Sequence, residues 1–327
     1  MELPKISILI ALRNEEKNIP RLLNSIDQLK PDGYEFEVLL GNDLSEDYTS
    51  KLIHEYASKR TFAKAFDVPE NTGNQKGKAR VLAFLACKAK GEYLFFTDAD
   101  IKLPENWIPS MMNGFQKKNT GVVIGITGMK AESAKMALQS MEWLTVLYIL
   151  HLLSKINFPG TGMGNNMAVS KAAYDSIGGY ENLPFSIVED YALFKAIIDK
   201  GFGFAQLFDK DSLAYTLPPE NFLVQRKRWL KGGFQSGSFL LIPALLQTLW
   251  LPLLIAFYFF AKSLLLPAFA LQIIVLGILT VFWTSKIKEV RLLKYLPLFV
   301  IYLPFSWFLI GIYTPLPGKI RWKGRDY

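Results

Sequence analysis

The chain has 327 residues but only one cysteine and two histidines. One cysteine cannot form an internal disulfide, which excludes a small secreted domain held together by disulfide bonds. Cys87 falls in a predicted helix and is interpreted as a small core residue rather than a nucleophile. His54 and His151 have no second histidine or cysteine nearby, so the sequence does not predict a zinc site.

Two long stretches in the last third of the chain have almost no charged side chains. Residues 238–284 contain one charged side chain, Lys262, and a second apolar run covers residues 295–314. A membrane-spanning helix needs about 20 apolar residues, so the first run is long enough for a helical hairpin that turns near Lys262. A buried soluble helix rarely stays uncharged over such a length. The sequence therefore predicts membrane insertion.

Positive charge exceeds negative charge, with a formal net charge of +8, but the excess lies beside the apolar runs. Residues 1–237 are almost balanced, at about +1. Lys and Arg residues that flank apolar segments are typical of cytoplasmic loops, so no nucleic-acid partner is expected. The flanking cations are Lys262; Lys286, Lys288, Arg291 and Lys294; and Lys319, Arg321, Lys323 and Arg325.

The expected number of spans is two or three. The hairpin returns the chain to its starting side, in agreement with the basic groups before and after it. A single further span over 295–314 would place the basic tail on the opposite side. Pro297, Pro304 and Gly311 would instead let this segment lie in the interface or re-enter the membrane. The sequence leaves both alternatives open.

The chain is thus expected to divide into a domain over residues 1–237 and a membrane anchor over residues 238–327. The first apolar run, Ile6–Leu12, is too short to span a membrane and suits a buried strand. The N-terminal domain is therefore expected on the cytoplasmic side of an inner or plasma membrane that the anchor crosses more than once.

Strand-like and helix-like segments alternate in the N-terminal domain. Such alternation is typical of an α/β fold with a mainly parallel, doubly wound sheet, in which ligands bind beyond the carboxyl ends of the strands. Ser45 is a candidate N-cap and Gly91 a candidate C′ residue. Strands are predicted near 6–12, 36–41, 93–97 and 122–126, and helices near 17–29, 46–59 and 77–90.

Carboxylates follow three of the predicted strands. Each group alone has an alternative interpretation as a turn former or a helix cap. Because parallel strands end at one edge of a sheet, the agreement between the three groups favours a ligand site at that edge. The side chains are Glu15 and Glu16 after the first strand, Asp43, Glu46 and Asp47 after the second, and Asp98 and Asp100 after the third.

The segment Asp98-Ala99-Asp100 carries the most specific chemistry. Two carboxylates on one short turn suit a hard divalent cation such as Mg²⁺ or Mn²⁺, which prefers oxygen ligands. A cation held there would bridge the two phosphates of a nucleoside diphosphate and neutralise it as a leaving group. Lys78 and Arg80 open the predicted helix 77–90 and are candidate phosphate contacts, the alternative being a solvated basic helix start.

The order of these motifs resembles that of the family 2 glycosyltransferases with the GT-A fold, over about residues 5–232. Residues 11–15, Ala-Leu-Arg-Asn-Glu, are similar to the family's P-x-x-N-E element, with Ala11 in place of proline. Residues 42–49, Asn-Asp-Leu-Ser-Glu-Asp-Tyr-Thr, resemble its D-D-x-S-x-D-x-T element, with Asn42 in place of the first aspartate. The resemblance implies a nucleotide-sugar donor that contacts Ala11, Arg13, Glu15, Asp43 and Asp98.

Two further elements resemble motifs of this family. Residues 162–168, Gly-Met-Gly-Asn-Asn-Met-Ala, are similar to a loop near the donor sugar, which implies a donor contact for Asn165; a plain turn is the alternative. Val188-Glu189-Asp190 resembles the E-D motif, which implies Asp190 as the catalytic base and Glu189 beside the acceptor. Inversion at an anomeric carbon needs a carboxylate to take the proton of the acceptor hydroxyl. An ordinary charge in the first turn of a helix is the alternative.

Residues 225–229, Gln-Arg-Lys-Arg-Trp, carry the Q-x-x-R-W pattern of membrane-bound members of the family. The resemblance implies Arg228 beside the diphosphate and Trp229 beside the acceptor, whereas the alternative is a juxtamembrane anchor. The apolar stretch 136–153 contains Glu142 and is interpreted as an interfacial or buried helix rather than a span. The ending at 322–327 is similar to a W-x-G-R-x-Y tail of related membrane enzymes, which favours a cytoplasmic tail.

The predicted function is the inverting, metal-dependent transfer of a sugar from a nucleotide sugar, by resemblance a UDP-sugar, to a membrane-associated acceptor. A lipid acceptor suits the short anchor. The Q-x-x-R-W pattern is frequent in processive synthases and keeps a growing polysaccharide as an alternative. A non-catalytic membrane subunit that binds nucleotide sugar is a second alternative, against which Asp98, Asp100 and Asp190 argue. The sequence does not indicate the sugar, the linkage or the oligomeric state.

Overall fold

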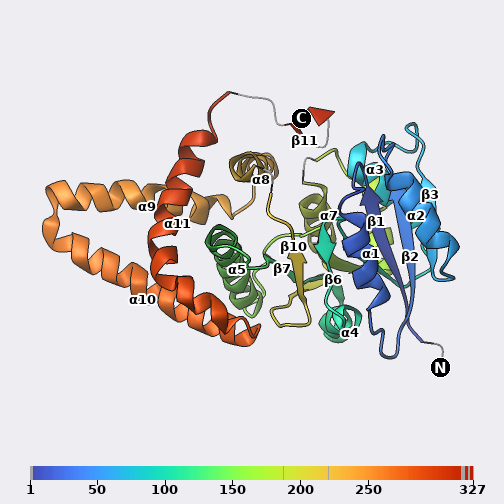
Figure 1. Ribbon diagram of the computed structural model, residues 1–327, viewed down its shortest axis with the longest axis horizontal. Coiled ribbons are helices and arrows are strands. Elements are labelled where there is room, and N and C mark those ends of the chain that lie inside the picture. The colour runs from blue at the N-terminus through green and yellow to red at the C-terminus, as the bar shows by residue number, and fades with distance from the viewer. Residues whose placement is uncertain (1–2, 187, 220, 318–320, 323–324, 327) are drawn as a thin grey trace. The chain divides into compact units, whose positions relative to one another are not determined.

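The computed structural model describes residues 3–186, 188–219, 221–317, 321–322 and 325–326 (Figure 1). Contacts between residues divide the chain into two compact units. The first unit comprises residues 1–127 and 150–217, and the second comprises residues 128–149 and 218–327. The second unit therefore takes in a segment from the middle of the chain. The boundary at residue 237 between the N-terminal domain and the membrane anchor stays a prediction.

A seven-stranded sheet forms the centre of the first unit. Its strands are β1 Lys5–Leu12, β2 Glu35–Asn42, β3 Ala63–Asp67, β4 Tyr93–Thr97, β6 Thr120–Ile124, β8 Asn166–Ser170 and β9 Gly203–Gln206. Their order in the sheet is β3-β2-β1-β4-β8-β6-β9. Neighbours are parallel except at β8, which runs antiparallel to both β4 and β6. The sheet is therefore mainly parallel, as predicted, with one reversed strand.

Strand β1 lies inside the sheet, and its almost unbroken apolar sequence follows from burial on both faces. Ile8 and Ile10 are fully buried. Ser7 is the polar exception: its hydroxyl donates to Glu37 Oε1 at 2.8 Å and accepts from the Gly91 amide at 2.9 Å. A β-carbon at Gly91 would lie 2.5 Å from the Ser7 backbone nitrogen, so glycine permits this close approach.

Of the helices of the first unit, the first three agree with the predicted positions to within a few residues at each end, and the others were not predicted. Three details of the prediction are wrong. The helices are α1 Ile19–Asp27, α2 Thr49–Ser58, α3 Gly77–Lys88, α4 Trp107–Asn113, α6 Lys171–Ser176 and α7 Glu189–Asp199. Ser45 is not an N-cap, because its hydroxyl accepts from the Asn14 amide at 3.0 Å and α2 begins after Tyr48. Gly91 is not a C′ residue, because α3 is already followed by an extended Ala89. Cys87 is exposed rather than part of the core.

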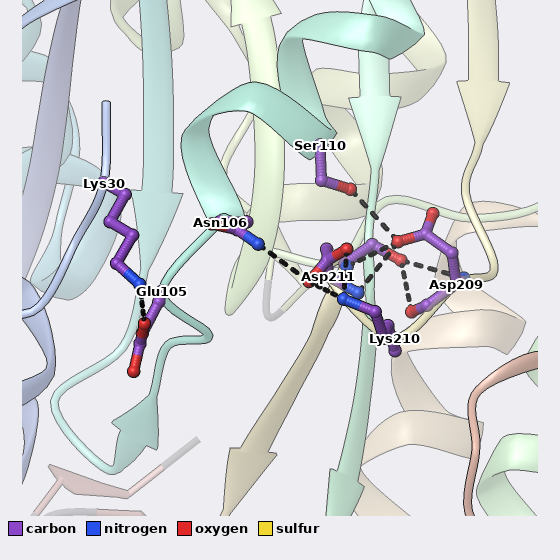
Figure 2. A network of polar contacts seen from close by, with 8 residues as sticks. Lys30, Glu105, Asn106, Ser110, Asp209, Lys210 and Asp211 are labelled. Atoms are coloured by element: carbon purple, nitrogen blue, oxygen red, sulfur yellow. Dashed lines mark hydrogen bonds and ion pairs between the residues drawn. The ribbon is translucent and has the colours of Figure 1, made fainter. Parts of the chain in front are cut away.

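A three-stranded sheet supports the turn that follows β4. It consists of β5 Ile101–Lys102, β10 Leu213–Thr216 and β7 Ile126–Met129, in the order β5-β10-β7. The loop before β10 is tied to the start of α4 (Figure 2): Asn106 Nδ2 donates to Asp211 Oδ1 at 3.3 Å, and Ser110 Oγ donates to Asp209 Oδ1 at 3.2 Å. This network fixes β10 and, with it, the position of Thr216.

The second unit contains the long apolar helices and one shorter helix that carries several basic residues (Figure 1). They are α5 Ala134–Ser154, of which residues up to 149 belong to this unit, α8 Phe222–Ser236, α9 Leu241–Phe260, α10 Lys262–Lys286 and α11 Leu296–Tyr313, the last preceded by the 3-10 segment η3 Val290–Tyr295. Within the described part of the chain, four segments are long and apolar enough to cross a membrane: α5, α9, α10 and η3 with α11. Helices α9 and α10 meet at Ala261, where the sequence predicts the turn of a hairpin.

Helix α5 is far more buried than the other apolar segments: 61% of its most apolar window is inside the protein, against 6% for α9. Glu142 of α5 pairs with Arg226 of α8 at 3.2 Å and accepts from the Tyr302 hydroxyl of α11 at 3.0 Å. The Arg226 guanidinium lies 4.4 Å from the centre of the Trp229 ring. These contacts give the charge of Glu142 buried partners, which agrees with the interpretation of α5 as a buried helix.

The end of α11 lies beside α8. Lys227 of α8 donates to the backbone carbonyl of Leu316, just beyond α11. Gly311 lets α11 approach α9 closely, because a β-carbon there would overlap the Thr248 side chain. The chain after α11 therefore returns to the helix that precedes α9. The predicted tail motif at 322–327 lies largely outside the described residues.

Candidate active site

Three of the predicted acidic residues of the first unit, Asp98, Glu189 and Asp190, lie around Lys78. Asp98 follows β4 directly, and Lys78 is the second residue of α3. The Lys78 ammonium lies 2.6 Å from Asp98 Oδ1 and 3.1 Å from Glu189 Oε1, although these residues come from distant parts of the chain. Burial favours the neutral amine, but Asp98, Glu189 and Asp190 raise the pKa of Lys78 above its usual range. The ammonium therefore stays charged.

Asp190 is held in place by two backbone amides. Its Oδ2 accepts from the Gly164 amide at 2.7 Å and its Oδ1 from the Tyr191 amide at 2.8 Å. Burial and the neighbouring charge of Glu189 raise the pKa of Asp190 to about 6, although Lys78 and the two amides act in the opposite direction. A fixed carboxylate whose pKa is close to neutrality is suited to take a proton from a hydroxyl.

The glycines of the loop before β8 allow α7 to begin this close to the loop. A β-carbon at Gly162 would overlap the backbone carbonyl of Asp190. A β-carbon at Gly164 would lie 3.0 Å from Asp190 Cβ and 3.3 Å from the Lys78 ammonium. The loop therefore owes its position beside Asp190 to the missing side chains, which favours the close-approach interpretation over a plain turn.

Asp98 and Asp100 have oxygen donors of the kind that Mg²⁺ and Mn²⁺ prefer. Asp100 Oδ2 accepts from the Thr216 hydroxyl at 3.0 Å, which ties the turn to β10. Within the described ranges, no three Asp, Glu, His or Cys side chains are gathered as a ready metal site. The Lys78 ammonium instead lies against Asp98. The oxygen ligands of the turn are chemically suited to a divalent cation.

The residues after β1 and β2 form one interlocked pair of loops. The Glu15 amide donates to the Thr49 hydroxyl at 2.7 Å, and the Glu46 amide donates to Asn14 Oδ1 at 2.9 Å. The Arg13 side chain donates to the Asp43 carbonyl at 2.9 Å. Several residues of both motifs thus hold the loops against each other, a structural role in addition to any contact with a ligand.

Arg80 lies away from Asp98, although the sequence places both near phosphate. It is buried, pairs with Asp43 Oδ1 and donates to the Pro69 carbonyl at 2.5 Å. Asp43 is itself only 5% exposed at its side chain. Arg80 therefore fixes Asp43 at the end of β2. The donor roles predicted for Ala11, Arg13, Glu15, Asp43 and Arg80 stay predictions.

The asparagines of the glycine loop have different surroundings. Asn165 accepts from the Thr127 hydroxyl at 3.3 Å through Oδ1 and from the Thr97 hydroxyl at 3.1 Å through its carbonyl. Asn166 is fully buried and binds Trp107 Nε1 at 2.9 Å, so its role is structural. Arg228 and Trp229 lie on α8 in the second unit, and their predicted roles at the diphosphate and the acceptor stay predictions.

Tyr180 belongs to the site, although its sequence context predicts no role for it. Its side chain is buried, and its hydroxyl has no hydrogen-bond partner among the residues that the structure describes. Burial, together with the charges of Glu189, Asp190 and Asp98, raises the pKa of Tyr180 well above its usual value. The signal that could have found it is its place directly after Gly178-Gly179 and shortly before Glu189-Asp190.

Residues 7–178 match the model of the family described as glycosyl transferase family 2. The chain is 26% identical over 247 residues to a beta-monoglucosyldiacylglycerol synthase of Trichormus variabilis, covering 71% of this chain and 50% of that protein. It is 27% identical over 240 residues to a poly-beta-1,6-N-acetyl-D-glucosamine synthase of Staphylococcus epidermidis, covering 70% and 55%. The chain thus spans about half the length of these curated relatives.

Among solved structures, the chain is similar to the mannosyltransferase PcManGT of Pyrobaculum calidifontis in complex with GDP-Man and Mn²⁺. The TM-score is 0.56 at 15% sequence identity, and the alignment covers 96% of this chain and 86% of the other. At this identity the likeness concerns the fold.

Proposed function

The chain belongs to glycosyl transferase family 2, and we propose that it transfers a sugar from a nucleotide sugar to an acceptor at the membrane. The observation that carries the proposal is the carboxylate of Asp190, which two backbone amides hold next to Glu189, Lys78 and Asp98. This arrangement supplies a proton acceptor and, within the same cluster, charged groups for a diphosphate.

Asp190 acts as the general base in the proposed reaction. It takes the proton of the acceptor hydroxyl while the oxygen of that hydroxyl attacks the anomeric carbon of the donor sugar. The bond from that carbon to the diphosphate breaks, and the nucleoside diphosphate leaves on the opposite face, which inverts the configuration. The raised pKa of Asp190 suits this step, because a stronger base accepts the proton more readily.

Asp98 and Asp100 are the residues proposed to hold Mg²⁺ or Mn²⁺ with the donor. A divalent cation bound there supplies charge neutralisation for the leaving diphosphate. The similar mannosyltransferase structure is a complex with Mn²⁺, which supports this choice. Thr216 contributes by fixing Asp100 through its hydroxyl, which keeps the turn after β4 in one conformation.

The nucleoside end of the donor is proposed to bind beyond β1 and β2. Asp43 and Glu15 are the acidic contacts, with Arg13 and the backbone at Ala11 beside them. The fixed position of Asp43 beside Arg80 supports this part of the proposal. A UDP-sugar is the proposed donor, and Asn165 and Arg228 are proposed as further contacts of its sugar and diphosphate.

A membrane lipid is the proposed acceptor, with Glu189 and Trp229 on its side of the site. Four apolar segments support a membrane location, and the similar glucosyldiacylglycerol synthase is named for a lipid product. A polysaccharide acceptor is the second candidate, favoured by the likeness to a poly-N-acetylglucosamine synthase. In both cases the catalytic domain is proposed to face the cytoplasm.

The test is the substitution Asp190→Asn in the full chain, assayed in detergent with Mn²⁺ and membrane lipid extract. Loss of the base should lower transfer by about 100-fold or more while donor binding persists. Asp199→Asn is the matched control, because Asp199 is an exposed residue at the other end of the same helix. Full transfer by the Asp190 variant, from any donor in a panel of nucleotide sugars, would contradict the proposal.

A further inference from the structure

The Lys78 ammonium occupies one carboxylate oxygen of Asp98, a residue proposed to hold the divalent cation. Its ammonium lies 2.6 Å from Asp98 Oδ1, closer than its 3.1 Å separation from Glu189 Oε1. Only 30% of its side chain is exposed. At this distance the ammonium is hydrogen-bonded directly to Asp98 Oδ1. A metal ion therefore cannot lie between these two atoms.

We propose that Lys78 is a built-in counter-ion, which pairs with Asp98 and Glu189 until the donor arrives and then moves to the donor's diphosphate. The idea rests on the proposed function, because it concerns the same donor and metal. It differs from the predicted role of Lys78 as a phosphate contact only. The lysine would take two positions in turn, and its departure from Asp98 would open that carboxylate to the divalent cation.

Charge and chain geometry support the exchange. A metal at Asp98 next to a resident ammonium would place like charges side by side in a partly buried site, where repulsion is stronger than in water. A diphosphate brings several negative oxygens, which compete for the ammonium as good hydrogen-bond acceptors. The lysine side chain has four flexible methylene groups and a single charged end, so it can change partners without movement of α3.

The exchange couples the two ligands. Since the diphosphate removes the ammonium from Asp98, the nucleotide should raise the affinity for the metal, and the metal should raise the affinity for the nucleotide by the same factor. Without the ammonium, Asp98 would be available to the metal at once. The metal would then bind to the chain alone, and the nucleotide would add little.

The test compares Lys78→Met with the unchanged full chain in detergent, by calorimetric titration of Mn²⁺ with and without UDP or GDP. The unchanged chain should bind Mn²⁺ about tenfold more tightly with the matching nucleotide than without it. Lys78→Met should bind Mn²⁺ without nucleotide about tenfold more tightly than the unchanged chain, and should lose most of the nucleotide effect. Lys76→Met is the matched control, since Lys76 is an exposed neighbour and should leave both affinities unchanged.

The location of the Mn²⁺ site at Asp98 is tested by adding Asp98→Asn to Lys78→Met. The double variant should lose the affinity for Mn²⁺ that Lys78→Met gained. Thermal unfolding of each variant verifies that it is folded. Equal Mn²⁺ affinity of Lys78→Met and the unchanged chain in the absence of nucleotide would overturn the counter-ion role while leaving the proposed transfer intact. No Mn²⁺ binding by either protein, even with nucleotide, would overturn the counter-ion role and the metal assignment together. The base assignment is tested separately by Asp190→Asn.

Discussion

At the scale of single residues, Asp190 and Lys78 oppose each other. Burial and Glu189 make the Asp190 carboxyl a weaker acid, whereas the Lys78 ammonium and two backbone amides favour its charged form. A general base works best when its pKa is near the working pH, because it is then both deprotonated and basic. In the proposed reaction, the balance of these effects on the pKa of Asp190 would set the pH range in which transfer is possible.

Transfer is expected to depend on pH through the Asp190 carboxyl, whose pKa is about 6. The base must be deprotonated, so kcat/KM should fall as the pH drops below about 6 and level off above it. Glu189→Gln should move this fall in kcat/KM to lower pH, because it removes the negative charge that helps to raise the pKa of Asp190. A profile of kcat/KM between about pH 5 and pH 8 checks both statements. A fall in kcat/KM only near pH 4, the pKa of an exposed carboxyl being about 4, would contradict the role of Asp190 as the base.

The sequence predicted the roles of residues that depend on their neighbours along the chain. It did not predict contacts between residues that only the fold brings together. Asp98 and Asp100 could be found because they directly follow an apolar strand. The pairing of Lys78 with Asp98 and Glu189 could not, because it joins α3, β4 and α7 across the sheet. Arg80 looked like a second phosphate contact two residues from Lys78, yet the helix turns it toward Asp43.

At the scale of elements, the glycine loop and α7 depend on each other. The loop contributes an amide to Asp190, and the first turn of α7 fills the space that a side chain at Gly162 would need. The sequence predicted the central strands well, because β1, β2 and β4 are continuous apolar runs. It did not predict β3, β8 and β9, because their sequences contain polar residues or glycine and have no continuous apolar run. Strand β8 lies between β4 and β6 in the sheet.

Gly162→Ala should therefore reduce transfer more than it reduces stability. The added methyl group would push the loop from the Asp190 carbonyl, and a displacement near 1 Å in a catalytic group costs up to about 100-fold in rate. Gly160→Ala is the control from the same loop, because a β-carbon there would lie 3.3 Å from its nearest neighbour, a Leu150 methyl group. Steady-state rates with thermal unfolding separate the two effects. Equal rates for both variants would contradict this account of the loop.

At the scale of the whole chain, the contacts of the described apolar segments bear on the predicted number of spans. The contact of Lys227 with the Leu316 carbonyl brings the chain after α11 back to α8. The sequence had left a span or a re-entrant segment over 295–314 as alternatives. The contact of the Leu316 carbonyl with α8 favours the re-entrant segment, which stays a prediction.

Cysteine accessibility in sealed vesicles checks this arrangement. In a Cys87→Ser background, cysteines introduced at Lys231 and Leu316 should react with an impermeant reagent from the same side, because α8 and the end of α11 are in contact. A cysteine at Ala261, between the two hairpin helices, should react from the opposite side. Reaction of the Leu316 position together with the Ala261 position would show that α11 crosses the membrane as an independent span.

The single exposed thiol, Cys87, is a site at which a spin label can be attached to the unmodified chain. Cys87 and Lys78 lie on the same helix α3, nine residues apart, which corresponds to about 14 Å along the helix axis. A paramagnetic ion such as Mn²⁺ near Lys78 would broaden the spectrum of a nitroxide attached to this thiol. The measurement needs no engineered cysteine. Occupancy of the catalytic end of the sheet can thus be read from the far end of α3, in a protein of native sequence.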